Sequence, residues 1–158
     1  YRAGAEWMRA NVPPGEIIFN TDWDDFPRLF YFDPSHRYVS GLDPTYLFDK
    51  DPALSKLYDR ITLGEESDPG PLIRDRFGSR YVFTDNSHGN FYDKANESGW
   101  FEVVYEDAQC MILHVRDQKL EPPAEEPLIE GQTGVTPSSE QPLIEGKTGT
   151  TTPPPEVP

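Results

Sequence analysis

The segment from Glu16 to Asp25, E-I-I-F-N-T-D-W-D-D, decides the fold of this chain. Its apolar residues, Ile17 to Phe19, are continuous rather than alternating, which is typical of a strand buried on both faces in a parallel sheet flanked by helices. The strand leads directly into a polar turn with three aspartates. Because open α/β sheets present their ligand crevice at the carboxyl ends of the strands, we predict an acidic loop at the binding rim.

Helix and strand patterns alternate on both sides of this segment. A helix over 3–11 precedes it and ends at Val12-Pro-Pro-Gly15, where proline prevents continuation. Helix patterns follow over 26–32, 53–62, 69–77 and 90–98, and strand patterns over 37–41, 80–85, 101–105 and 109–115. A further helix start lies at Asp43-Pro44. A short turn joins the last two strands, as in a hairpin. This order predicts an α/β three-layer sandwich with a mainly parallel sheet and a C-terminal antiparallel hairpin.

The composition changes abruptly after Val115. All 3 Trp, 8 Tyr and 9 Phe residues precede this point, whereas the remainder is rich in Pro, Glu, Gly and Thr. We therefore predict a globular domain over 1–115 and a disordered tail over 116–158. Within the tail, the sequence P-L-I-E-G begins at Pro127 and occurs again at Pro142, 15 residues later. The repeat is either a duplication within a linker or a pair of short segments that order on a partner.

Charge and motif content exclude several classes of function. The net charge of −14 argues against nucleic acid as a partner. The chain has neither a G-x-G-x-x-G nor a Walker sequence, so nucleotide binding is unsupported. Its histidines, His36, His88 and His114, fall in three separate segments, so we expect no metal site and no cofactor. The single cysteine, Cys110, lies in an apolar run and is expected to be buried.

Two polar loops are expected to share one rim of the sheet. One follows the strand at Ile17 and the other follows the strand at Tyr81, and parallel strands would bring both loops to the same edge. There, carboxylates would hydrogen-bond a ligand and an aromatic ring would stack on it. The predicted binding residues are Asp22, Trp23, Asp24, Asp25, Arg28, Asp43, Tyr46, Asp85, Asn86 and His88.

Plainer interpretations of the same residues exist. The aspartates after the first strand suit capping of a helix N-terminus. His88 beside a serine and an aspartate suggests hydrolase parts, but no G-x-S-x-G elbow occurs in the chain, and no catalytic residue is assigned. The aromatic residues between 23 and 48 are expected to serve mainly the core, with a sugar-stacking groove as the alternative. They are Trp23, Phe26, Phe30, Tyr31, Phe32, Tyr38, Tyr46 and Phe48.

Three runs of the sequence resemble one known family. They are W-M-R-A-N-V-P-P-G-E-I-I-F-N-T-D-W-D-D-F-P-R-L-F-Y-F (7–32), R-Y-V-S-G-L-D-P-T-Y-L (37–47) and R-Y-V-F-T-D (80–85). Together they look like the soluble C-terminal region of bacterial multi-spanning membrane proteins related to C-type glycosyltransferases. The resemblance covers about residues 3 to 115. It implies a globular α/β domain on the extracytoplasmic face, after the last membrane helix.

The resemblance also implies a function. Catalysis in that family lies in loops of the membrane part and uses a polyprenyl-phosphate sugar, so the chain itself is expected to be a non-catalytic accessory domain. Its expected partners are the membrane-spanning part of the same protein and a glycan or polyprenyl-phosphate sugar. It would lie on the extracytoplasmic side of the bacterial inner membrane, tethered by an upstream membrane region. Two alternatives stay open, a surface interaction module acting through the repeat tail and a small free-standing hydrolase.

Overall fold

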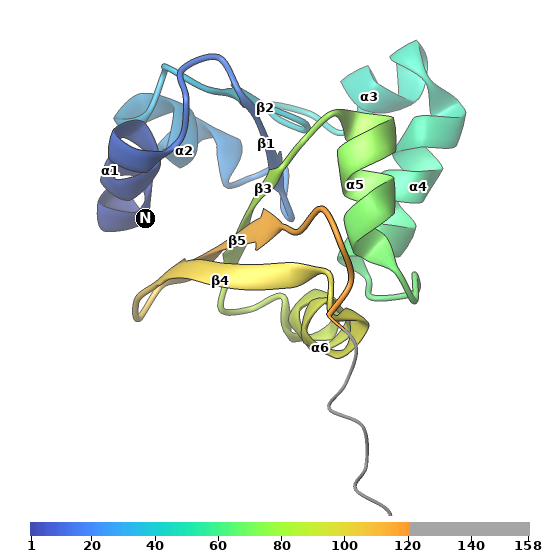
Figure 1. Cartoon of the computed structure of the whole chain (residues 1–158). Coiled ribbons are helices and arrows are strands. Elements are labelled where there is room, and N and C mark those ends of the chain that lie inside the picture. Colours follow the sequence, from blue (N-terminus) through green and yellow to red (C-terminus); the bar gives the residue numbers. More distant parts are fainter. Residues whose placement is uncertain (121–158) are drawn as a thin grey trace, which may run out of the picture. The chain divides into compact units, whose positions relative to one another are not determined.

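The computed structural model describes residues 1–120 (Figure 1). The repeat from Pro127 and most of the predicted tail lie outside this range. The elements are α1 (Arg2–Asn11), β1 (Ile17–Asn20), α2 (Phe26–Phe32), β2 (Arg37–Tyr38), α3 (Thr45–Lys50), α4 (Pro52–Thr62), α5 (Pro69–Phe77), β3 (Tyr81–Asp85), α6 (Gly89–Ser98), β4 (Phe101–Glu106) and β5 (Cys110–Val115).

A single five-stranded mixed sheet has the order β2-β1-β3-β5-β4. Strand β1 pairs in parallel with both β2 and β3, and Phe19 lies opposite Val82. Strand β5 pairs antiparallel with β3 and with β4. The predicted α/β class, the parallel pairing of the first three strands and the C-terminal hairpin are thus confirmed. The sheet as a whole is mixed rather than mainly parallel, with two parallel and two antiparallel pairings.

Helices pack against both faces of this sheet. Phe19 and Val82 lie in a hydrophobic cluster with residues of α4, α5 and α6, whereas Ile18 and Phe83 lie in a second cluster with residues of α1 and α2. Figure 1 shows α1 and α2 on one side of the strands and α4 and α5 on the other. Because successive side chains of a strand point to opposite faces, burial on both faces explains the continuous apolar run of β1.

Local signals place the helix ends close to their expected positions. Asp51 caps α4, since its Oδ1 accepts from the backbone N–H groups of Ala53 at 3.0 Å and Leu54 at 2.9 Å. Helix α5 ends at Gly78, whose φ of 67° belongs to the left-handed region that favours glycine. The one-residue differences from the predicted helix bounds lie within ordinary fraying of helix ends. The strand predicted over 37–41 was too long, since β2 covers only Arg37–Tyr38.

The described chain stays attached to the domain beyond β5. The backbone N–H of Arg116 donates to the carbonyl of Trp100 at 2.7 Å, and that of Leu120 donates to the carbonyl of Gly99 at 3.0 Å. The five residues after Val115 therefore run back along the turn between α6 and β4. Among residues 1–120, no helix has the length and apolar character needed to cross a lipid bilayer.

Candidate functional site

The loops after β1 and β3 lie side by side at the carboxyl ends of these strands. The Thr21 hydroxyl donates to that of Thr84 at 3.0 Å, and the Thr21 N–H donates to the Phe83 carbonyl at 3.1 Å. The expectation that parallel pairing would bring these two polar loops to one rim is therefore confirmed.

His88 connects the two loops. Its Nδ1 lies 2.7 Å from Asp85 Oδ1, and its Nε2 lies 3.6 Å from Asp22 Oδ2. Asp85 Oδ1 also accepts from the N–H of Ser87 at 3.0 Å and from its hydroxyl at 2.7 Å. Burial opposes ionisation of Asp85, but hydrogen bonds from His88 and Ser87 outweigh it and lower the pKa of the carboxyl.

Asp25 lies beneath this pair with little access to solvent. Its side chain is 2% exposed, and Oδ2 has no hydrogen-bond partner among the described residues. Burial raises the pKa of Asp25 to about 6; the nearby Tyr1 hydroxyl opposes the shift, and the carboxylates of Asp85 and Asp22 add to it. Asp22, Asp25, Asp85 and His88, hereafter the acidic rim, thus contain one carboxyl that takes up a proton near pH 6.

Tyr1 belongs to this site although nothing in its sequence context predicts it. Its hydroxyl donates to Asp85 Oδ2 at 3.0 Å, and the guanidinium carbon of Arg28 lies 5.5 Å from its ring centroid. Burial, followed by the carboxylates of Asp25 and Asp85, raises the pKa of Tyr1. The hydroxyl therefore stays protonated and donates. Its partner is 84 residues away in the chain, so no local pattern marks the contact.

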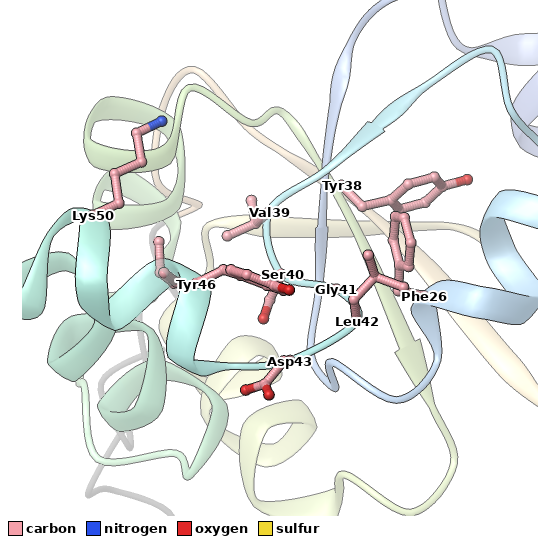
Figure 2. Close-up of a pocket in the computed structure, with 10 residues that line it drawn as sticks. Phe26, Tyr38, Val39, Ser40, Gly41, Leu42, Asp43, Tyr46 and Lys50 are labelled. Carbon is pink, nitrogen blue, oxygen red and sulfur yellow. The ribbon is translucent and has the colours of Figure 1, made fainter.

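The loop after β2 joins the same rim. The Asn20 side chain donates to the carbonyls of Asp22 at 2.6 Å and Ser40 at 2.7 Å. Beside Ser40 opens a pocket of about 290 Å³, hereafter the aromatic pocket (Figure 2). Figure 2 shows Tyr46 and Phe26 on either side of the Ser40–Leu42 segment. The residues that line the aromatic pocket are Phe26, Tyr38, Val39, Ser40, Gly41, Leu42, Asp43, Tyr46, Leu47 and Lys50.

The backbone of the aromatic pocket is constrained at two adjacent positions. A Cβ at Gly41 would lie 2.3 Å from the Phe26 ring, so only glycine allows this approach. Leu42 has a φ of 62°, in the left-handed region that a leucine adopts at a cost of about 1–3 kcal/mol. Local strain of this kind gathers at ligand-binding sites, which makes the pocket a candidate for binding.

The expectation that the aromatic residues between 23 and 48 mainly serve the core is wrong for five of them. Trp23, Phe30, Tyr31, Tyr46 and Phe48 are 41%, 49%, 79%, 65% and 48% exposed. Helix α2 buries only Leu29 fully, and α3 buries no residue. Because β2 pairs over only two residues at the sheet edge, these short helices have little sheet surface to cover.

The remaining predicted residues have distinct surroundings. Asp43 Oδ1 accepts from the Thr45 N–H at 2.8 Å and from its hydroxyl at 2.7 Å, and these bonds lower the pKa of Asp43. Asn86 lines a cavity of about 180 Å³ that Asp85 and His88 also line. Asp24 is exposed at the turn after β1, where its N–H donates to Asp22 Oδ1 at 3.2 Å.

A second aspartate–histidine pair escaped the sequence reasoning. Asp33 Oδ2 lies 2.5 Å from His36 Nδ1, and both side chains are fully buried. His36 Nε2 lies 3.2 Å and 3.1 Å from the carbonyls of Val12 and Pro13. Carbonyl oxygens only accept, so Nε2 carries a proton and donates toward them. The sequence signal that could have revealed this pair is the pattern Asp-x-Ser-His, which begins at Asp33 and occurs again at Asp85.

No group of three or more His, Cys, Asp or Glu side chains suited to holding a metal ion occurs among residues 1–120. Comparison of the chain with known protein families, with characterised proteins and with solved structures gives no match. The acidic rim and the aromatic pocket are therefore the structural features that bear on function.

Proposed function

We propose that this chain is a non-catalytic accessory domain that contacts a glycan through the aromatic pocket and the adjoining acidic rim. The observation that carries this proposal is the exposed Tyr46 ring beside the Asp43 carboxylate, in a partly preformed pocket. Carbohydrate rings offer an apolar face that stacks on aromatic side chains and hydroxyl groups that donate to carboxylates. Asp22, Asp24 and Asp43 supply such acceptors near exposed rings.

Binding fits the rim better than hydrolysis. In a Ser-His-Asp triad the serine hydroxyl donates to the histidine, whereas the Ser87 hydroxyl donates to Asp85. The His88 ring is already placed between Asp85 and Asp22. A histidine held in this way keeps its ring in a fixed orientation toward a ligand hydroxyl.

The wider setting of the domain is part of the same proposal. We infer a three-layer α/β sandwich on the extracytoplasmic side of a bacterial inner membrane, tethered by the membrane-spanning part of a glycosyltransferase-like protein. The ligand would be an acceptor glycan or a polyprenyl-phosphate sugar. The support is the sequence resemblance over about 3–115, together with a net charge of −14, which opposes adhesion to anionic lipid and suits a tethered module.

The test compares two exposed aromatic residues of α3 in the full 158-residue chain. Tyr46 lines the aromatic pocket and Phe48 does not, although both are exposed. On a glycan array followed by calorimetry, Tyr46→Ala should weaken binding of the best glycan about tenfold, because one stacking contact is lost. Phe48→Ala should bind as the unchanged chain does, and both variants should keep its melting temperature.

A second variant separates ligand contact from helix capping at the rim. Asp24→Ala should also weaken glycan binding while the melting temperature stays nearly the same, because Asp24 is exposed. Equal losses of affinity and melting temperature would instead make the aspartates after β1 structural caps. The proposal fails if no glycan binds the unchanged chain, or if Phe48→Ala weakens binding as much as Tyr46→Ala.

A further inference from the structure

A further pocket, of about 280 Å³, lies beside the amino ends of β1 and β2. Its charged lining consists of Arg37, Lys50 and Arg76, with no acidic side chain. The rest of the lining is apolar or aromatic: Ile17, Tyr38, Val39, Leu47, Leu54 and Phe77. We call this site the basic pocket. Three cations around one cavity are notable in a chain whose net charge is −14.

These three cations lack carboxylate partners within the described residues. Seven other Lys and Arg side chains there form ion pairs, whereas Arg37, Lys50 and Arg76 form none. Arg37 Nε donates to the Gly15 carbonyl at 3.0 Å, which holds the guanidinium at the pocket. Figure 2 shows the Lys50 side chain extending away from Asp43. The positive charge of the basic pocket is therefore available to a ligand.

The floor of the basic pocket is part of the folded core. Val39, Leu47 and Leu54 are partly buried and pack against the hydrophobic cluster that contains Phe77. The pocket stays open because β2 is a two-residue edge strand, with no further strand beyond it. A ligand there would meet a firm apolar surface and three cations at once.

We propose that the basic pocket binds a phosphate monoester that carries a compact apolar group. A phosphate monoester has a charge between about −1.5 and −2 at pH 7. It therefore matches the charge of three cations better than a ligand with one carboxylate would. Arginine guanidinium groups bind phosphate oxygens in a two-pronged geometry, and a lysine ammonium adds a point charge. The aliphatic floor takes the apolar group. The basic pocket adjoins the aromatic pocket and shares Tyr38, Val39, Leu47 and Lys50 with it. Phosphate binding here does not depend on the proposed glycan contact.

Calorimetry with the full 158-residue chain and octyl phosphate below its micelle concentration tests the proposal. Octyl phosphate should bind at least about tenfold more tightly than inorganic phosphate or octyl glucoside, because only it supplies both the anion and the apolar chain. Arg37→Gln and Arg76→Gln should each weaken binding about tenfold. Both residues line the basic pocket but not the aromatic pocket, and both are exposed.

Arg9→Gln is the matched control, since Arg9 is exposed, forms no ion pair among the described residues and lies on α1 away from the pocket. It should bind octyl phosphate within about twofold of the unchanged chain. Arg76→Lys keeps the charge and should bind more tightly than Arg76→Gln. Tyr46→Ala should leave octyl phosphate binding unchanged, which separates this site from the proposed glycan site.

Several results would overturn the proposal. Equal binding of inorganic phosphate would mean that the apolar floor contributes nothing, and equal binding of octyl glucoside would mean that the cations contribute nothing. If Arg9→Gln weakened octyl phosphate binding as much as Arg37→Gln does, the loss would reflect the overall charge of the chain rather than a contact in the basic pocket. Absence of detectable octyl phosphate binding by a chain with its normal melting temperature would overturn it outright.

Discussion

The chain builds the same four-residue turn twice, at Asp33-Pro-Ser-His36 and at Asp85-Asn-Ser-His88. In each turn the aspartate Oδ1 accepts from the serine N–H and hydroxyl, at 3.2 and 2.5 Å in the first and at 3.0 and 2.7 Å in the second. In each, histidine Nδ1 lies against the aspartate, at 2.5 and 2.7 Å. The local chemistry is the same, so any difference in role comes from the surroundings.

The surroundings differ completely. His36 is fully buried, and its Nε2 faces the carbonyls of Val12 and Pro13 at the end of α1. The His88 side chain is 22% exposed, and its Nε2 faces Asp22 across the rim. The first turn therefore ties α1 to the start of β2, whereas the second leaves its ring partly exposed at the acidic rim. A short motif specifies a turn, and only its tertiary position separates a structural pair from a candidate binding pair.

The largest effect should come from removing each histidine. His36→Ala should lower the free energy of unfolding by about 3–5 kcal/mol, because it leaves Asp33 as a buried carboxylate without its partner. His88→Ala should lower it by no more than about 1 kcal/mol, as expected for a partly exposed pair. Urea denaturation of the two variants at pH 7 measures both values.

The comparison breaks if the two histidine variants lose similar free energy. Equal losses near the larger value would make the rim pair a structural element and would weaken its assignment as a ligand contact. If neither variant lost free energy of unfolding, other groups would be replacing His36 as the partner of the buried Asp33 side chain. Circular dichroism of each variant before denaturation controls for gross misfolding.

A smaller effect concerns Asp25, the neighbour of the exposed turn. Its pKa of about 6 in the folded state exceeds the value of 3.8 for an unshifted aspartate. Between these two pH values the folded chain keeps a proton that the unfolded chain has released. The free energy of unfolding should therefore fall as pH rises from about 4 to 6, by about 3 kcal/mol from this group. Asp25→Asn should remove that fall.

The measurement is the difference in free energy of unfolding between Asp25→Asn and the unchanged chain at four pH values from 4 to 7. Subtraction cancels the opposite dependence from carboxyls with a lowered pKa, such as Asp85. The difference should grow in favour of the variant as pH rises. A constant difference would show that Asp25 ionises normally. Asp85→Asn removes one charge that raises the Asp25 pKa and should shrink the effect.

The smallest effect comes from the serine of each turn. Ser35→Ala should cost about 1 kcal/mol, because it removes a donor from the fully buried Asp33 carboxylate. Ser87→Ala should cost less than about 0.5 kcal/mol, since water can replace its hydroxyl at the exposed turn. Thermal unfolding of both variants sharpens the comparison. If Ser87→Ala proves the more costly, burial is not what distinguishes the turns.

Much of the fold followed from patterns near in sequence. The run Ile17 to Phe19 indicated a strand buried on both faces, and the patterns over 69–77 and 90–98 predicted two helix ends that the structure confirms. The exposure of Tyr31 and Phe48 could not be predicted in this way. Aromatic content indicates apolar area, but the length of β2 and its edge position decide how much area the sheet can cover.

The amino-acid sequence by itself determined the order of helices and strands and the acidic loops after β1 and β3, because turn residues, proline and apolar periodicity act over a few positions. Only the tertiary structure decided that Tyr1 lies on Asp85, 84 residues away, that Arg37 and Arg76 share a pocket, and that His36 is buried while His88 is not. Burial and electrostatic field depend on residues far apart in the chain, and the free energy of a charge is set by its surroundings rather than by its neighbours in sequence.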